Sequence, residues 1–283
     1  MRTRRARPLL GTLVDIRVDH GGVDGVDEAR ALAAIEAAFA EIADVHRLMS
    51  FHEAASDVSR INRDASRAPV VVDPRTHEVI ALALAFARES QGRFDPTIAA
   101  ELVAWNLLPR PGNAPVPAID ADWRDIELCE DGRIRANRPL WIDLGGIAKG
   151  YAVDRAIDRL RAFGIDDACV NAGGDLRRIG RGTEPVHIRT AAAPHRPVRT
   201  LLLGEGSIAS SGSYFERAHV DAIARTPMRE RCVSVVADRC VVADALTKIV
   251  MCDADAATPL LDAWNAEALV FDGDDARLLG CAA

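Results

Sequence analysis

Lysine is rare in this chain, and both of its lysines stand beside residues that could bind phosphate or a metal ion. The 283 residues include 35 Lys and Arg, but only Lys149 and Lys248 are lysines. Lysine carries a compact point charge, whereas arginine carries a wide planar fork. A lysine that persists in so Arg-rich a chain is therefore a candidate for a role that Arg cannot fill. The alternative is that both lysines are exposed surface residues that have no functional role.

The first lysine follows a pair of glycines. Residues 141–160 read WIDLGGIAKGYAVDRAIDRL, in which a strand-like apolar run ends at Gly145–Gly146 and a helical pattern then begins. Glycines let backbone N–H groups approach a ligand closely, and a helix N-terminus attracts anions. We therefore expect a phosphate cradle with Lys149 in the first helical turn. The spacing is neither a P-loop nor GxGxxG, and a tight turn with a solvated lysine is the alternative.

Two further turns could complete such a cradle. Residues 171–175, NAGGD, close the strand that follows this helix. If the strands on either side of the helix run parallel, both glycine turns lie at the same edge of a sheet. Asp175 is then either a ligand contact or a buried cap. Residues 210–213, SSGS, are expected to form a third small-residue turn that donates hydroxyl and N–H groups.

The second lysine directly follows a candidate metal site. Asp244 and Thr247 are three residues apart in an expected helix and so share one face. A carboxylate and a hydroxyl are oxygen ligands of the kind that Mg²⁺ prefers. The alternative is a helix-capping aspartate with a surface threonine. Lys248 beside this pair favours a binding site.

Around these residues, the sequence mixes helical and strand-like patterns without a regular alternation. We therefore expect an α+β fold rather than a doubly wound sheet. No shift in composition marks a second domain, so one domain over residues 1–283 is predicted. Helices are expected near residues 27–50, 76–92, 94–108, 148–163, 242–252 and 258–266. Strands are expected near 12–18, within 122–145 around a tight turn at 131–132, and near 166–172, 186–191, 198–204, 228–237 and 267–279.

Composition and charge exclude several classes of function. The net charge of −7 argues against broad nucleic-acid binding. No apolar run approaches eighteen residues, so no membrane span is predicted. Asp15 and Arg17 interrupt the apolar part of the basic N-terminus, so we expect no signal peptide, no lipoprotein cysteine and a cytoplasmic location.

The six scattered cysteines show no zinc-binding spacing and are expected to be free thiols.

Seven stretches together resemble the FAD:protein FMN transferase (ApbE) family over nearly the whole chain. Each alone is weakly diagnostic, but they occur in the family's order. They are RPLLGTLVDIRV (7–18), MSFHEAASDVSRIN (49–62), GRFDPTIAAELVAWNL (92–107), IDLGGIAKGYAVD (142–154), VNAGGDL (170–176), SIASSGSY (207–214) and ADALT (243–247).

The resemblance implies a T-fold-like ApbE architecture of mixed sheets with packed helices. It implies an enzyme that binds FAD and Mg²⁺ and transfers FMN to a Thr or Ser hydroxyl of a partner flavoprotein, releasing AMP. Lys149 and Asp244 would be catalytic, and Mg²⁺ would be held by Asp244, Thr247 and the Gly146 carbonyl. The residues implied to contact FAD are Met49, Ser50, Asn62, Asp95, Thr97, Lys149, Asp154, Gly173, Gly174, Asp175, Ser211 and His219.

The sequence departs from the family pattern at defined places. The family usually has a Thr four residues after the aspartate of ADALxT, where this chain has Lys248. That lysine could pair with phosphate, displace the metal or share the site with it. The family's His–Ile–Asp–Pro segment appears as residues 219–222, HVDA, so His219 either touches the flavin or acceptor or is an exposed loop residue. The alternatives to a transferase are an FAD pyrophosphatase that yields free FMN and AMP, and a non-catalytic FAD-binding protein.

Overall fold

The computed structural model of the chain describes residues 1–20, 27–190, 193, 195–212, 220–227, 231–272 and 275–280. His219 and Ser213 lie outside the described residues. Within the described ranges, no helix combines the length and apolar character that crossing a membrane requires.

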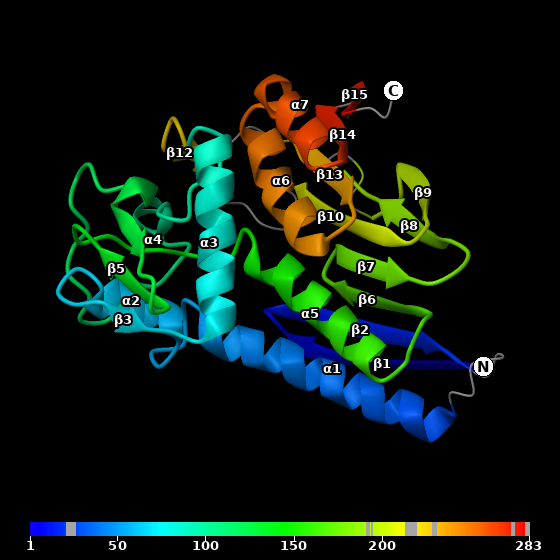
Figure 1. The fold of residues 1–283 in the computed structure, drawn as a ribbon. Coiled ribbons are helices and arrows are strands. Elements are labelled where there is room, and N and C mark those ends of the chain that lie inside the picture. Colours follow the sequence, from blue (N-terminus) through cyan, green and yellow to red (C-terminus); the bar gives the residue numbers. More distant parts are fainter. Residues whose placement is uncertain are drawn as a thin grey trace.

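A sheet of eight strands forms the centre of the structure (Figure 1). Its order is β1-β2-β6-β7-β10-β13-β14-β15, and each of these neighbouring pairs is antiparallel. The strands are β1 (Arg2–Leu9), β2 (Thr12–Asp19), β6 (Ala168–Ala172), β7 (Asp175–Ile179), β10 (Gly206–Gly212), β13 (Cys232–Ala237), β14 (Glu267–Asp272) and β15 (Asp275–Leu279).

Helices α5 (Ala148–Ala162) and α6 (Cys240–Cys252) pack side by side on one face of this sheet (Figure 1). Helix α1 (Glu28–Met49) packs against α5 and reaches β1 and β2. Its apolar residues recur at helical spacing; Ile35, Phe39 and Ile42 are buried, whereas Leu32 is only partly buried. Helix α7 (Ala254–Ala263) packs beside α6.

A smaller group of elements lies to one side of the main sheet, at the left of Figure 1. It contains a three-stranded sheet in the order β3-β5-β4. Its neighbourhood comprises α2 (Asp57–Asp64), β3 (Val70–Val71), α3 (Pro74–Glu89), α4 (Ala99–Ala104), the short 3-10 helix η1 (Trp123–Asp125), β4 (Ile126–Leu128) and β5 (Arg133–Ala136). Two separate two-stranded sheets complete the described elements: β8 (Glu184–Ile188) with β9 (Arg199–Leu203), at the right of Figure 1, and β11 (Val220–Asp221) with β12 (Thr226–Pro227).

The α+β class is confirmed, but several local predictions are wrong. Residues 141–144 form no strand, because side chains and a loop take their backbone groups: Ile142 pairs with Asn62, and the Asp143 N–H donates to the Pro96 carbonyl. The parallel strand–helix–strand unit is therefore absent. Ser210 to Gly212 lie in β10 rather than in a turn, and the helix expected over 94–108 shrinks to α4.

Strand β1 was missed because its sequence is dominated by arginine. Arg2 and Arg4 pair with acidic residues of β2, and Arg7 pairs with Glu36 of α1. These partners come from elements distant in sequence or from the adjacent strand, so the local pattern of apolar residues carried no signal for the strand.

Candidate active site

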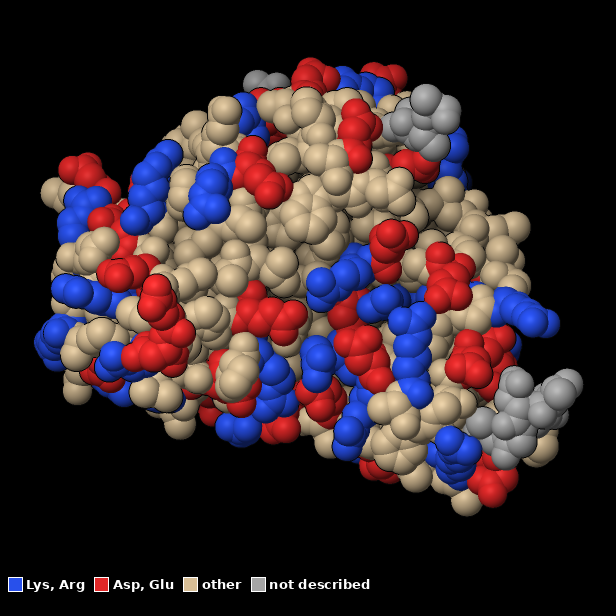
Figure 2. Space-filling view, in the orientation of Figure 1, with Lys and Arg blue, Asp and Glu red and all other residues tan. Residues whose placement is uncertain are grey.

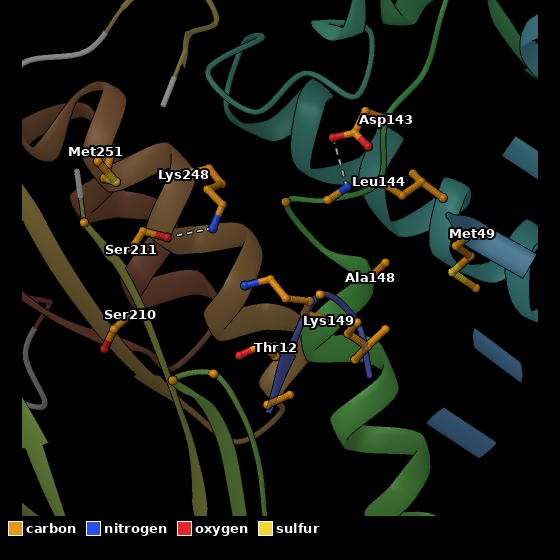
Figure 3. A pocket seen from close by; sticks show the side chains of 18 of the residues that line it. Thr12, Met49, Asp143, Leu144, Ala148, Lys149, Ser210, Ser211, Lys248 and Met251 are labelled. Carbon is orange, nitrogen blue, oxygen red and sulfur yellow. Dashed lines mark hydrogen bonds between the residues drawn. The ribbon is translucent and has the colours of Figure 1, made fainter. Parts of the chain in front are cut away.

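A cleft of about 1530 Å³ opens where the end of α1, the start of α5, β10 and α6 meet. Ligand pockets for drug-sized molecules commonly measure about 300–1,000 Å³, so a dinucleotide has room here. Figure 3 shows Lys149 and Lys248 entering this cleft from α5 and α6, with both amino groups directed into the same region. On the outer face in Figure 2, acidic and basic side chains are interspersed rather than segregated.

The loop before α5 forms one wall of the cleft. The Asn62 side chain holds it from behind, accepting the Ile142 N–H at 2.7 Å and donating to the Ile142 carbonyl at 3.0 Å. Asp143 accepts the N–H of Gly145 at 3.1 Å (Figure 3). Gly145 and Gly146 both line the cleft. Asn62 is buried and does not line the cleft, so it supports the glycine loop and would not contact a ligand.

The second glycine turn joins β6 to β7 and lies in the same cleft. Gly173 and Gly174 have φ of +67° and +108°, conformations that favour glycine. The Asn171 side chain accepts the Gly174 N–H at 3.0 Å and fixes the turn. A Cβ on Gly173 would lie 2.5 Å from Thr12 Oγ1. The two glycine turns therefore meet as expected, although through antiparallel strands and a loop rather than parallel strands.

Lys149 forms an ion pair at the floor of the cleft. Its Nζ lies 2.9 Å from Asp175 Oδ2, and Asp175 is 1% exposed. Burial raises the pKa of Asp175 to about 6, with repulsion from Asp244 adding to the effect and Lys149 opposing it. Lys149 itself lines the cleft, whereas Asp175 does not. The ammonium is thus available to an anionic ligand, and the carboxylate stands behind it.

Lys248 forms the second ion pair, with Asp244 one helical turn earlier in α6. Its Nζ lies 3.1 Å from Asp244 Oδ1, 3.0 Å from Thr247 Oγ1 and 2.7 Å from Ser211 Oγ. Burial alone would raise the pKa of Asp244, but the Lys248 and Lys149 ammonium groups outweigh it and lower that pKa. Two buried carboxylates and the chain's two lysines therefore form one cluster.

Helices α5 and α6 touch closely at Gly150. A Cβ there would lie 2.4 Å from the Cys240 carbonyl oxygen. The Gly150 N–H donates to Asp244 Oδ2 at 3.0 Å. One donor at the start of α5 is thus already used by a carboxylate of the protein, and the close contact fixes the separation between the two lysine-bearing helices.

Asp154 caps α6 from the middle of α5. Its carboxylate accepts the N–H groups of Cys240 and Val241 at 2.9 and 3.0 Å and pairs with Arg177 at 2.8 Å. Burial raises the pKa of Asp154, although Arg177 and the two N–H groups act to lower it. Asp154 does not line the cleft. The arrangement supports a role in placing α6, which carries Asp244 and Lys248.

In the FDPT motif, residues 94–97, Asp95 lies on the cleft wall and Thr97 is buried behind that wall. Asp95 lines the cleft and accepts both the N–H and the hydroxyl of Thr97, at 2.7 and 2.6 Å. Arg225 donates to its other oxygen at 2.8 Å. Burial raises the pKa of Asp95, although the hydrogen bonds from Thr97 and the charge of Arg225 act to lower it. Thr97 is buried and absent from the lining, so it orients Asp95.

The structure thus divides the predicted site residues into two groups. Those on the cleft wall are Met49, Ser50, Asp95, Gly146, Lys149, Gly173, Gly174 and Ser211. Those buried behind the wall are Asn62, Thr97, Asp154, Asp175, Asp244 and Thr247. His219 lies outside the described residues.

Sequence reasoning did not place three contributors to the cleft. Lys248 is not among the residues implied to contact FAD, although its place beside Asp244 indicated a binding site, and it lines the wall. Thr12 packs against Gly173, and Asn171 fixes the Gly174 N–H. The position of Asn171 directly before Ala-Gly-Gly was a usable signal, because Asn commonly bonds to backbone groups in turns. No local signal marked Thr12.

The predicted Mg²⁺ ligands do not fit a metal ion as they are arranged. Asp244 Oδ1 and Thr247 Oγ1 both accept from the Lys248 ammonium, and Asp244 Oδ2 accepts the Gly150 N–H. The Thr247 hydroxyl donates to the Asp244 backbone carbonyl at 2.7 Å. Elsewhere in the described ranges, no group of three or more His, Cys, Asp or Glu could hold a metal. A cation already stands between these oxygens and the cleft.

Fold and site together define an α+β protein whose cleft has a glycine-rich, lysine-bearing floor suited to an anionic ligand. The chain belongs to the ApbE family, whose model matches residues 10–270. It is 30% identical to the FAD:protein FMN transferase of Vibrio cholerae, covering 84% of this chain and 78% of that protein. It is 28% identical to the FAD:protein FMN transferase of Treponema pallidum, covering 86% and 76%.

Solved structures agree with this assignment. The crystal structure of the ApbE protein from Thermotoga maritima superposes with a TM-score of 0.81 at 26% identity, covering 95% of this chain and 94% of that one. The flavin transferase ApbE from Vibrio cholerae gives 0.79 at 22% identity, covering 98% and 96%, which shows a shared fold. The expected family and architecture are confirmed.

Proposed function

We propose that this protein is an FAD:protein FMN transferase, which moves FMN from FAD to a Thr or Ser hydroxyl of a partner flavoprotein and releases AMP. The observation that carries the proposal is the meeting of Lys149 and Lys248 at the floor of a cleft of about 1530 Å³. FAD contains a pyrophosphate, and splitting it requires stabilisation of negative charge. Membership of a family with transferases of this name supports the same activity.

In the proposed reaction, the acceptor hydroxyl oxygen attacks the FMN-side phosphorus of FAD. A new oxygen–phosphorus bond forms, the bond to the bridging oxygen breaks, and AMP leaves with that electron pair. Lys149 neutralises charge on the pyrophosphate from the first turn of α5. The hydroxyl proton passes to a base. Asp175 and Asp244 are the two candidate bases. Both stand behind the cleft wall, each paired with a lysine, so that lysine would have to move aside before either carboxylate could take the proton.

Other predicted residues position these groups. Asn62 and Asp143 hold the glycine loop that faces the pyrophosphate, and Thr97 and Arg225 orient Asp95. Met49 and Ser50 would contact the flavin from the end of α1, and Gly173, Gly174 and Ser211 would contact FAD from the opposite wall. A flavin or acceptor contact by His219 stays a prediction.

Mg²⁺ also stays a prediction, with Asp244, Thr247 and the Gly146 carbonyl as its ligands. Binding it there requires the Lys248 ammonium to leave two of those oxygens, which lie 3.1 and 3.0 Å from Nζ. A single domain over residues 1–283 and a cytoplasmic location likewise stay predictions; fractionation that finds the protein only in the periplasm would contradict the location.

The test measures AMP release from FAD and covalent flavin on an acceptor domain that carries a candidate Thr. A flavinylated acceptor, detected by in-gel fluorescence and by an added FMN mass, supports the transferase; the same acceptor with its Thr replaced by Val is the control. AMP with only free FMN supports the pyrophosphatase. Bound FAD without AMP supports a non-catalytic flavin-binding protein.

A further inference from the structure

We propose that the Lys248 ammonium takes the place of a divalent cation in this protein, so that the pyrophosphate of FAD is bound and neutralised without Mg²⁺. The inference rests on the proposed function, because it concerns the same cleft and the same ligand. It differs from the expectation of a magnesium-dependent enzyme, and it decides among the three roles that the sequence left open for Lys248: pairing with phosphate, displacing the metal or sharing its site.

The first support is the complete use of the ammonium's hydrogen-bonding capacity. A lysine ammonium has three N–H donors and no acceptor. Lys248 Nζ has three oxygen partners within range, Ser211 Oγ at 2.7 Å, Thr247 Oγ1 at 3.0 Å and Asp244 Oδ1 at 3.1 Å. Two of the three are the side-chain oxygens predicted to hold Mg²⁺. The protein thus already supplies a cation to the oxygens that a metal would need.

The second support is the order of the groups from the cleft inward. Asp244 and Thr247 are both 0% exposed and do not line the cleft, whereas Lys248 and Ser211 do. The Lys248 side chain also lies against the third predicted ligand residue, since a Cβ on Gly146 would stand 3.4 Å from its Cγ. A metal on these oxygens would therefore need the space that the lysine occupies.

The third support is the balance of charge. Asp244 and Asp175 are each paired with one lysine, and the two ammonium groups face the cleft ahead of their carboxylates. A divalent ion on Asp244 would lie beside the Lys248 ammonium and be repelled by it. A pyrophosphate with two negative charges would instead meet two positive ones, Lys149 and Lys248, at the N-terminus of α5.

A purely structural role for Lys248, neutralising Asp244 without touching ligand, makes different predictions. In that case removing the lysine would lower stability but leave the affinity of the folded protein for FAD unchanged. Affinity, measured apart from stability, therefore separates the two roles.

The first experiment uses the wild-type protein and needs no variant. Mn²⁺ serves as a probe for the divalent site, and the electron paramagnetic resonance signal of free Mn²⁺ is titrated with protein and FAD, against FAD alone. We expect no stoichiometric uptake of Mn²⁺. We also expect the affinity for FAD, from flavin fluorescence, to change less than about twofold between EDTA and excess Mg²⁺, because the ammonium supplies the charge. Uptake of one equivalent of Mn²⁺ with FAD binding at least about tenfold weaker in EDTA overturns the proposal.

The second experiment removes the ammonium. Lys248→Met should weaken FAD binding in EDTA by about tenfold or more, because the positive charge that attracts the phosphates from the cleft wall is lost. Lys248→Thr should gain Mn²⁺ binding, and its FAD affinity should become Mg²⁺-dependent. Arg135→Met, at an exposed position of β5 away from the cleft, is the matched control and should bind FAD as wild type does. Wild-type affinity in Lys248→Met overturns the proposal.

Lys248→Met leaves the buried Asp244 carboxylate without its lysine and could fail to fold. The double variant Asp244→Asn/Lys248→Met removes both charges and carries the same expectation for FAD affinity. If wild type binds no FAD in either medium, the proposed function fails and this inference falls with it. If it binds FAD equally in both but releases no AMP to any acceptor, transfer fails while the assignment of the cation site holds.

Discussion

The Asp154 carboxylate on α5 accepts the backbone N–H of Cys240, the first residue of α6, at 2.9 Å. The residue that would cap α6 locally, Arg239, makes no side-chain cap hydrogen bond. A tertiary contact thus supplies the cap that the sequence of α6 lacks, and it ties the helix that carries Lys248 to the helix that carries Lys149.

Replacing Asp154 should therefore disturb both stability and ligand binding. Asp154→Ala leaves Arg177 without its buried partner and should lower the free energy of unfolding by about 3–5 kcal/mol. Asp154→Asn keeps an oxygen that can cap α6 and should cost only about 1–2 kcal/mol. Urea unfolding measures both values. Equal losses in the two variants would contradict the capping role, and FAD affinity should fall more in Asp154→Ala although Asp154 lies behind the cleft wall.

Gly150 should tolerate no side chain. Gly150→Ala would place Cβ 2.4 Å from the Cys240 carbonyl oxygen and 2.8 Å from Asp244 Cβ. Because both neighbours are held in a packed helix, α5 and α6 must separate, and we expect a loss of about 1–3 kcal/mol by thermal or urea unfolding. Ala is normally the better helix former. A stabilised Gly150→Ala variant would therefore show that the helices are not in close contact.

Lys149→Met should reduce AMP release by roughly 100-fold, as expected when a group that stabilises transition-state charge is removed. Lys149→Arg keeps the charge but not the compact ammonium, and should recover only part of the rate. Single-turnover AMP release, measured at saturating FAD, separates the chemical step from binding. Wild-type rates in Lys149→Met would remove this lysine from the proposed reaction.

Stability should fall as the pH rises through the titration of Asp175. The folded-state pKa of about 6 lies above the ordinary value of 3.8, so the folded protein binds more protons than the unfolded chain between these values. The free energy of unfolding contributed by this group therefore decreases across that window and stays low above it. Urea unfolding at a series of pH values should show this decline, and Asp175→Asn should lack it. Parallel pH profiles for the two proteins would contradict the raised pKa.

Much of the architecture followed from local pattern. The apolar spacing of residues 27–50 predicted α1, and Gly145–Gly146 followed by Lys149 predicted the start of α5. Periodicity works there because one face of each helix packs on the core. It failed at β1, where arginines pair with acidic residues, and at residues 141–144, where Asn62 replaces a strand partner.

For the site, the residue types and their spacing were enough to identify the chemical groups: two lysines, two glycine turns and the Asp244–Thr247 pair on one helical face. Which of these groups reach a ligand depends on contacts between elements that are distant in the sequence. Helical geometry places Lys248 one turn beyond Asp244, but the contact of α5 with α6 and the position of Ser211 on β10 direct its ammonium over the predicted metal oxygens. Those partners come from separate parts of the chain, and no local pattern encodes how they meet.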